Sequence, residues 1–171
     1  PDLVWGEPGC FAGEAFPGSE PFIGPGGRLA PNLDGRMAAP EYPDGARLVT
    51  DSLGLRREGP LSAQPAPGTR RVLSLGDSFS TGFAADQDHY FCSLLEGELS
   101  AAGPTEVLPA EISDPAYGLH YLQRHGLDLA PDLVLLGLCA NDAMQAHWFA
   151  GPGRRFRLEE GVLVANPDWD G

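Results

Sequence analysis

A serine follows directly after a short apolar segment of the chain, where its hydroxyl could act as a nucleophile. Residues 71–75 are rich in Val and Leu, which is typical of a buried strand, and Gly76 permits a sharp turn after them. Ser78 then falls where the next helix or loop begins. Sites in open α/β sheets lie at the carboxyl ends of strands, where backbone N–H groups can stabilise a negatively charged oxygen. The alternative is a strand-terminating turn that Asp77 or Ser78 caps.

A second apolar segment ends in an amide side chain. Residues 133–138 predict another strand, and Asn141 and Asp142 follow it. An Asn amide at a strand end can donate a hydrogen bond to a developing oxyanion, and loss of one such donor typically costs about 3 kcal/mol of transition-state stabilisation. Alternatively, the two residues cap a helix that begins near Ala143. If the two strands are parallel neighbours, Ser78 and Asn141 meet at one edge of the sheet.

The order of these motifs resembles that of the SGNH hydrolases, the GDSL family of esterases and lipases. Residues 75–82 match the first block of the family, and residues 131–138 with Asn141 and Asp142 match the third. Residues 50–56 resemble a leader found in a bacterial subset. The resemblance implies an α/β fold of flavodoxin-like type, with three α/β/α layers around a parallel sheet.

The resemblance also implies roles for individual residues. Ser78 matches the nucleophile, with its own backbone N–H as one oxyanion donor, and Asn141 matches the side-chain donor. The second block of the family contributes a glycine N–H. Residues 114–118 place Ala116 at that position, with Gly118 as the neighbouring candidate. Alanine can donate its N–H but adopts a positive φ less cheaply than glycine.

The sequence departs from the family at the general base. The family uses a histidine three positions after an aspartate, near the end of the domain, and no such pair follows Asn141 here. A serine without an adjacent base is a weak nucleophile. His147 is the best internal candidate for a substitute base, and we assign it with Asp77 and Asp142 to the substrate-binding part of the site. Cys139 stands where the family usually has a glycine.

The remaining histidines and the cysteines have simpler explanations than metal binding. His89 follows Asp86 and Asp88, but Asp88 precedes an apolar helical pattern and is better explained as its N-cap. We expect His120 and His125 on the helix after the second block. The 3 cysteines lack metal-ligand spacing and allow at most one internal disulfide. We therefore predict no metal and no cofactor.

The chain divides into a leader and part of an α/β domain. Residues 1–70 hold most of the 17 prolines, and we expect them to wrap over the core. Residues 71–171 form the N-terminal part of the SGNH-like domain. Only three buried parallel strands are predicted, at residues 71–75, 106–108 and 133–138. We expect the rest of the sheet, with the base, in a C-terminal segment beyond residue 171 or in a second chain.

Shorter elements are predicted on either side of the sheet. In the leader, we expect a strand at residues 47–49 and a loop at residues 51–56 near the catalytic edge. Arg56 in this loop either forms a surface ion pair or binds a substrate anion. After the third block, residues 155–158 and 162–164 predict a β-hairpin.

Composition narrows the range of partners. The formal net charge of −13 argues against nucleic acid and anionic membrane surfaces. No apolar run is long enough to span a bilayer, so we expect a soluble chain, and an excised signal or anchor would leave no trace. The function predicted is an esterase or deacylase for a small-molecule or carbohydrate acyl ester. The alternatives are a catalytically inactive binding or assembly module, or one part of a split enzyme.

Overall fold

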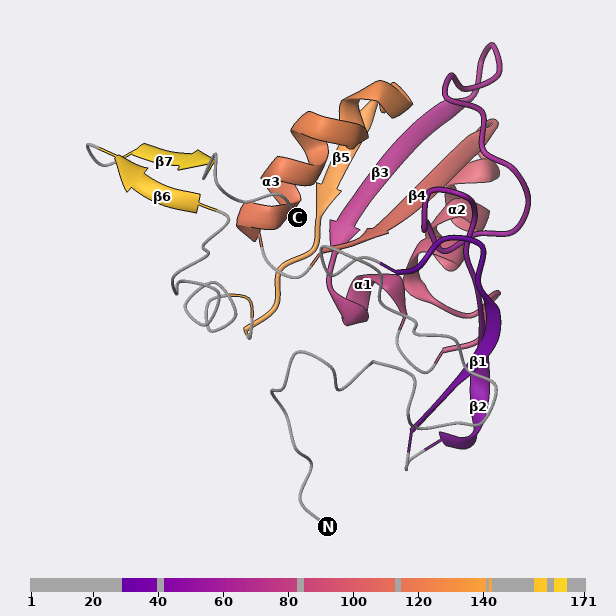
Figure 1. Cartoon of the computed structure of the whole chain (residues 1–171). Coiled ribbons are helices and arrows are strands. Elements are labelled where there is room, and N and C mark those ends of the chain that lie inside the picture. The colour runs from indigo at the N-terminus through magenta and orange to yellow at the C-terminus, as the bar shows by residue number, and fades with distance from the viewer. Residues whose placement is uncertain are drawn as a thin grey trace.

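A three-stranded parallel sheet forms the centre of the structure, a computed structural model that describes residues 29–39, 42–82, 85–112, 115–140, 142, 156–159 and 162–165. The middle strand is β3 (Arg70–Gly76), flanked by β4 (Thr105–Glu111) and β5 (Leu133–Leu136) (Figure 1). Both neighbours run parallel to β3. The mixed α/β class and the positions of the three predicted parallel strands are therefore confirmed, but the predicted burial of the third is wrong, since β5 ends at Leu136 and is largely exposed.

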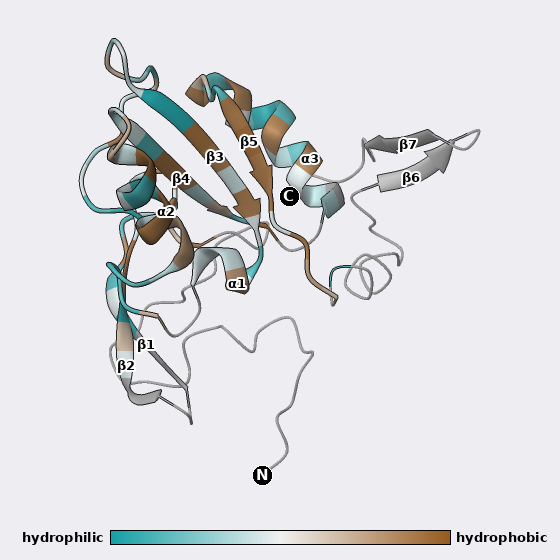
Figure 2. Cartoon of the chain, turned by 180° about the vertical axis from the view of Figure 1, so that it is seen from behind, coloured by the Kyte–Doolittle hydropathy of each residue, from teal (hydrophilic) through white to brown (hydrophobic). Residues whose placement is uncertain are grey.

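The central strand is apolar on both faces because each face is covered. Val72 packs with Cys92 and Val107 on one side, and Leu73 packs with Leu108 and other residues on the other. Successive side chains of a strand point to opposite faces, which explains why neighbouring residues enter different clusters. Figure 2 shows the resulting apolar colouring along β3 and β5.

Helices supply the cover. Helix α2 (Phe91–Ser100) places Cys92 in the Val72 cluster, and α3 (Pro115–Tyr121) places Tyr117 and Tyr121 in the Leu73 cluster. A π-helical turn, η2 (Leu122–Gly126), and a short 3₁₀ turn, η3 (Leu127–Leu129), continue α3. The first helix of the chain, α1 (Ser78–Thr81), begins two residues after the end of β3.

The predicted cap of α2 is wrong. The N-cap is Tyr90, which makes no side-chain capping bond, while the exposed Asp88 carboxylate lies 2.7 Å from Nδ1 of His89. The helix therefore begins at Phe91, two residues later than expected. The hydroxyl of the buried Tyr90 donates to the Arg56 carbonyl oxygen at 2.6 Å, which ties this end of α2 to the leader.

The leader contributes an antiparallel hairpin. It consists of β1 (Asp34–Ala39) and β2 (Tyr42–Val49), so the strand predicted at residues 47–49 is the end of a longer one. Leu29, Leu33 and Leu48 form a small core of their own beside it. Residues 1–28, to which the predicted wrapping mainly refers, lie outside the described residues.

The second predicted hairpin is confirmed. Strands β6 (Phe156–Glu159) and β7 (Val162–Ala165) pair antiparallel. Figure 1 shows the hairpin set apart from the parallel sheet.

Two of the cysteines can be placed. Cys92 and Cys139 are thiols, and Cys10 lies outside the described residues. Within the part of the chain that the structure describes, no helix combines the length and the apolar character needed to cross a bilayer.

A buried arginine holds the amino end of the sheet together. Arg71 is fully buried, and its guanidinium donates to the Glu106 carboxylate at 2.6 and 2.8 Å. It also donates to the carbonyl oxygens of Ser62, Ala63 and Leu129, at 3.0, 2.9 and 2.6 Å respectively. The leader, β4 and the end of η3 are thereby joined to β3 through one side chain.

Arg71→Ala is therefore expected to lower the free energy of unfolding by about 3–5 kcal/mol, because it strands a carboxylate and three carbonyl groups. The matched control is Arg70→Ala, since Arg70 is exposed on the same strand and its loss should cost less than about 0.5 kcal/mol. Chemical denaturation of both variants measures the difference. Equal losses would show that the Arg71 network contributes nothing special.

Candidate active site

Ser78 is the first residue of α1, directly after the carboxyl end of β3. The carboxylate of Asp77, the N-cap, accepts a hydrogen bond from the Phe79 N–H at 3.0 Å. The Asp77 carbonyl accepts from the N–H groups of Ser80 and Thr81, each at 3.0 Å. The prediction that Ser78 begins a helix is confirmed, and the capping by Asp77 is also observed.

The backbone N–H of Ser78 is suited to its predicted role as an oxyanion donor. Because Ser78 stands at the first helical position, no residue of α1 precedes it to accept this N–H within the helix. The helix ends one turn later at Gly82, where a φ of 82° allows the Gly82 N–H to reach the Ser78 carbonyl at 3.0 Å. The half-buried Ser78 side chain therefore sits on a turn closed at both ends.

The third block meets the first at the same edge of the sheet. The Gly137 N–H donates to the Leu75 carbonyl oxygen at 2.8 Å, which continues the pairing of β5 with β3. Beyond it, the half-buried Cys139 thiol donates to the Asp77 carboxylate at 3.0 Å. The buried Asp142 carboxylate accepts from the Cys139 N–H at 2.6 Å.

These contacts bring Cys139 and Asp142, which flank the predicted oxyanion donor Asn141, close to residues 77–82, the predicted nucleophile turn that carries Ser78. Ligand atoms of Asp77, Cys139 and Asp142 all lie within 4.8 Å of one another. A divalent ion could use such a set, but the hydrogen bonds already use these atoms, and we assign no metal to them. These hydrogen bonds also engage the carboxylates of Asp77 and Asp142, whose contacts with substrate remain predictions. Asn141 and His147 lie outside the described residues.

The second block lies within α3 rather than before it. Ala116 and Gly118 are the second and fourth residues of this helix, which begins at Pro115. Proline suits the first helical position, since its ring fixes φ and its missing N–H would have no partner there. That signal was present in the sequence. In the first turn, the Ala116 N–H has no acceptor within the helix, as its predicted role as an oxyanion donor requires.

His120 and His125 were expected on a helix after the second block, but His120 lies in α3 together with that block, and His125 lies in η2. His120 stacks on Tyr117 with ring centroids 6.4 Å apart, and His125 lies 5.6 Å from Tyr121 across η2. These ring contacts give both histidines a structural explanation.

Arg56 corrects a prediction. Its guanidinium is buried rather than exposed, and it donates to the carbonyl oxygens of Thr81 and Gly82 at 2.7 and 2.6 Å. Further bonds reach the carbonyls of Arg47 and Ala85, at 2.9 and 2.5 Å, and the Gln87 side chain at 3.1 Å. Both the surface ion pair and the substrate contact were wrong, because the guanidinium is fully used inside the protein.

The surroundings of Arg56 are unusual for a cation. Its guanidinium carbon lies 4.3 Å from the centre of the Tyr90 ring. Burial lowers the pKa of Arg56 and raises that of Tyr90. The hydrogen bonds counted above all end on carbonyl oxygens, so dipoles rather than a carboxylate hold the charge at the end of α1. The predicted loop at residues 51–56 does lie near this edge.

Sequence reasoning missed Glu111. This residue ends β4 opposite Gly76, and its carboxyl is hydrogen-bonded to the Thr81 hydroxyl. Burial, reinforced by the negative charge of Asp77, raises the pKa of Glu111 to about 7, despite opposing effects of Thr81 and Arg56. The only signal in the sequence is an acidic residue after a buried strand.

Close packing fixes α1 against the sheet. A Cβ added at Gly76 or at Gly137 would overlap the Ser80 side chain. Gly76 ends β3, and Gly137 lies just after β5. The Ser80 side chain fits between these strand ends only because neither position carries a side chain.

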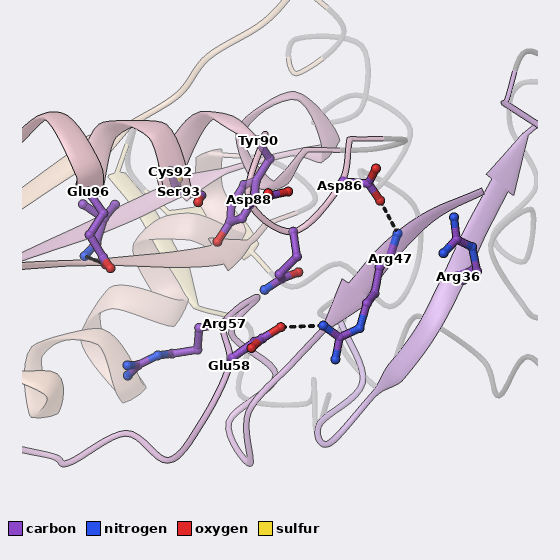
Figure 3. Close-up of a pocket in the computed structure, with 12 residues that line it drawn as sticks. Arg36, Arg47, Arg57, Glu58, Asp86, Asp88, Tyr90, Cys92, Ser93 and Glu96 are labelled. Carbon is purple, nitrogen blue, oxygen red and sulfur yellow. Dashed lines mark hydrogen bonds and ion pairs between the residues drawn. The ribbon is translucent and has the colours of Figure 1, made fainter. Parts of the chain in front are cut away.

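An open cavity lies away from Ser78. It measures about 630 Å³ and is bounded by the β1–β2 hairpin, residues 57–58 and 86–88, and the start of α2 (Figure 3). Its walls carry both signs of charge, and Arg47 pairs there with Glu58 at 2.6 Å. None of the described site residues Ser78, Gly118 and Asp142 lines it.

Comparisons with protein-family models, with curated proteins and with solved structures return no match to this chain. The site must therefore be interpreted from its own geometry.

Gly76→Ala is expected to lower the free energy of unfolding by about 1–3 kcal/mol, because the new methyl group displaces Ser80 and with it α1. Gly97→Ala is the control. No atom lies within 4 Å of a Cβ at this position in α2, and the substitution should stabilise the helix by about 0.5–1 kcal/mol. Denaturation curves give both values. A Gly76 variant as stable as the wild type would contradict the close approach.

Proposed function

We propose that the chain carries the nucleophile and oxyanion-hole part of a serine esterase or deacylase of the SGNH type, within a three-layer, flavodoxin-like α/β/α domain. The observation that carries this proposal is the contact between the first and third blocks, made by the Cys139 thiol and the Asp77 carboxylate at 3.0 Å. It joins the turn of Ser78 to the loop that leads to Asn141. The family resemblance predicted this juxtaposition from motif order alone.

In the proposed reaction, the Ser78 oxygen attacks the carbonyl carbon of an ester. The tetrahedral oxyanion is held by the N–H of Ser78, an N–H of Ala116 or Gly118, and the Asn141 carboxamide. Collapse releases the alcohol and leaves an acyl-serine. Attack by water then completes hydrolysis, whereas attack by a sugar or other hydroxyl completes acyl transfer. A base takes the Ser78 proton in the first step and returns it to the leaving alcohol.

The free side of the sheet supports the idea that more polypeptide completes this site. Leu133, Val134 and Leu136 of β5 are 56, 37 and 46% exposed although their sequence is that of a strand covered on both faces. The apolar colouring of β5 is visible in Figure 2. We propose that a C-terminal segment or a second chain covers β5 and supplies the base.

The same observations favour a second candidate. No aspartate–histidine pair follows Asn141. Without a base, a fold of this type would be a binding or assembly module. If a partner chain supplies the base, this chain is one part of a split enzyme. Both alternatives keep the exposed β5 as an interaction surface. In the binding module Ser78 does not react, whereas in the split enzyme it reacts only when the partner chain is present.

The substrate class follows only in outline. The formal net charge of −13 disfavours polyanionic substrates, and we propose an uncharged small-molecule or carbohydrate acyl ester.

Labelling with a fluorophosphonate probe separates these readings. The folded full-length protein should be labelled on Ser78, since the probe phosphorus accepts attack by an activated serine. Ser78→Ala should abolish labelling, while Ser52→Ala, at an exposed serine of the leader, should leave its rate unchanged. Mass spectrometry of the labelled peptide identifies the site. A folded protein that takes up no probe would favour the binding module.

A further inference from the structure

We propose that the neutral carboxyl group of Glu111 is a positioning residue that holds the nucleophile turn through Thr81, and that its ionisation loosens α1 and slows reaction at Ser78. The part that concerns reactivity rests on the proposed function, and the part that concerns α1 does not.

The Thr81 hydroxyl has a single proton to donate but two neighbouring oxygens. Its oxygen lies 3.2 Å from the Asp77 carbonyl oxygen and is also hydrogen-bonded to the Glu111 carboxyl. One hydroxyl donates one hydrogen bond at a time. If Glu111 is protonated, it donates to Thr81 while Thr81 donates to Asp77, and all bonds coexist. If Glu111 is ionised, Thr81 must donate to it and the bond to Asp77 is lost.

Glu111 lies next to the segment that leads into α1. Glu111 pairs with Gly76 across the sheet, and the Ile112 N–H donates to the Gly76 carbonyl oxygen at 2.9 Å. Asp77 and Ser78 are the next residues of the chain after Gly76, and Thr81 is the last residue of α1. A change at Glu111 is therefore transmitted to both ends of the four-residue helix that carries the nucleophile.

Two charged groups act on the Glu111 carboxyl. Among the described groups, the Asp77 carboxylate repels an ionised Glu111, and the Arg56 guanidinium attracts it. The nearby acidic groups of α2 are engaged elsewhere, since the Cys92 thiol donates to the Ser80 carbonyl at 3.5 Å and the Glu96 carboxylate accepts from the Val107 N–H at 2.7 Å. Arg56 is itself tied to the carbonyls of Thr81 and Gly82. A second negative charge would thus compete for the cation that secures α1.

The direction of the pH effect follows. The pKa of Glu111 is raised to about 7 from 4.5, so the folded state favours the protonated form. Its contribution to stability is complete below the unfolded value and is lost as the pH rises through about 7. The nucleophile turn should therefore be firm at pH 6 and loosened at pH 8.

The test compares wild type with Glu111→Gln, because glutamine keeps a donor toward Thr81 and cannot ionise. Two quantities are measured from pH 6 to pH 8. These are the rate of fluorophosphonate labelling at Ser78, and the hydrogen-exchange protection of the Thr81 and Gly82 amides, corrected for intrinsic exchange. Glu98→Gln, at an exposed position of α2, is the control.

We expect the labelling rate of wild type, divided by that of Glu111→Gln, to fall up to about tenfold between pH 6 and pH 8, following the neutral fraction of Glu111. The division cancels the titration of any base that both proteins share. Protection of α1 should fall in wild type and in the control but stay constant in Glu111→Gln. A pH-independent ratio together with unchanged protection would overturn the inference.

The two proposals can fail separately. If no protein is labelled but protection of α1 still falls with pH in wild type and in Glu98→Gln while it stays constant in Glu111→Gln, the esterase proposal fails and the role of Glu111 stands. If labelling is confined to Ser78 but its pH dependence is the same in Glu111→Gln, the reverse holds. Should Glu111→Gln not fold, protection measured in wild type alone still decides, since constant protection of Thr81 and Gly82 across pH 7 contradicts the inference.

Discussion

The position of Ser78 depends on one buried cation. Arg56 binds the carbonyl oxygens at the end of α1 and those of two other segments, so a single guanidinium joins the leader, the nucleophile turn and the residues before α2. A four-residue helix is too short to be stable alone. Its persistence requires contacts from outside, which are supplied by Arg56 at its end, by the Asp77 cap at its start and by the Ser80 side chain packed between two glycines. The leader is therefore part of the sheet edge that carries Ser78.

The two edges of the sheet use different chemistry. At the amino edge, Arg71 pairs with the Glu106 carboxylate, which anchors the strands. At the carboxyl edge, the ionisable groups are those of Arg56, Glu111 and Asp77, and hydrogen bonds run through thiol, hydroxyl and carbonyl groups. Such an arrangement is stable while each donated proton has a single acceptor. It is also open to change by a single ionisation, which is the property expected of a reactive edge rather than of a structural one.

The sequence predicted the strands and the start of α1 because these follow from local patterns. An apolar run as short as residues 133–138 favours a strand, and a glycine followed by Asp77 and Ser78 is a turn and cap signal. The partner of Arg56, the role of Glu111 and the start of α2 could not be predicted in this way. Each involves groups distant in sequence, such as Thr81, whose carbonyl oxygen accepts from Arg56 and whose hydroxyl is hydrogen-bonded to Glu111. The placement of Ala116 inside α3 was within reach, since Pro115 marks a first helical position.

The central claim is that the Ser78 hydroxyl and the Asn141 carboxamide serve one carbonyl group. The most direct measurement is a crystal structure of the protein with a phosphonate bound covalently to Ser78. The account predicts that the phosphoryl oxygen accepts hydrogen bonds from the Asn141 amide nitrogen and the Ser78 N–H at about 2.7–3.1 Å. An Asn141 side chain turned to another face of the sheet, with the phosphoryl oxygen in solvent, would contradict it.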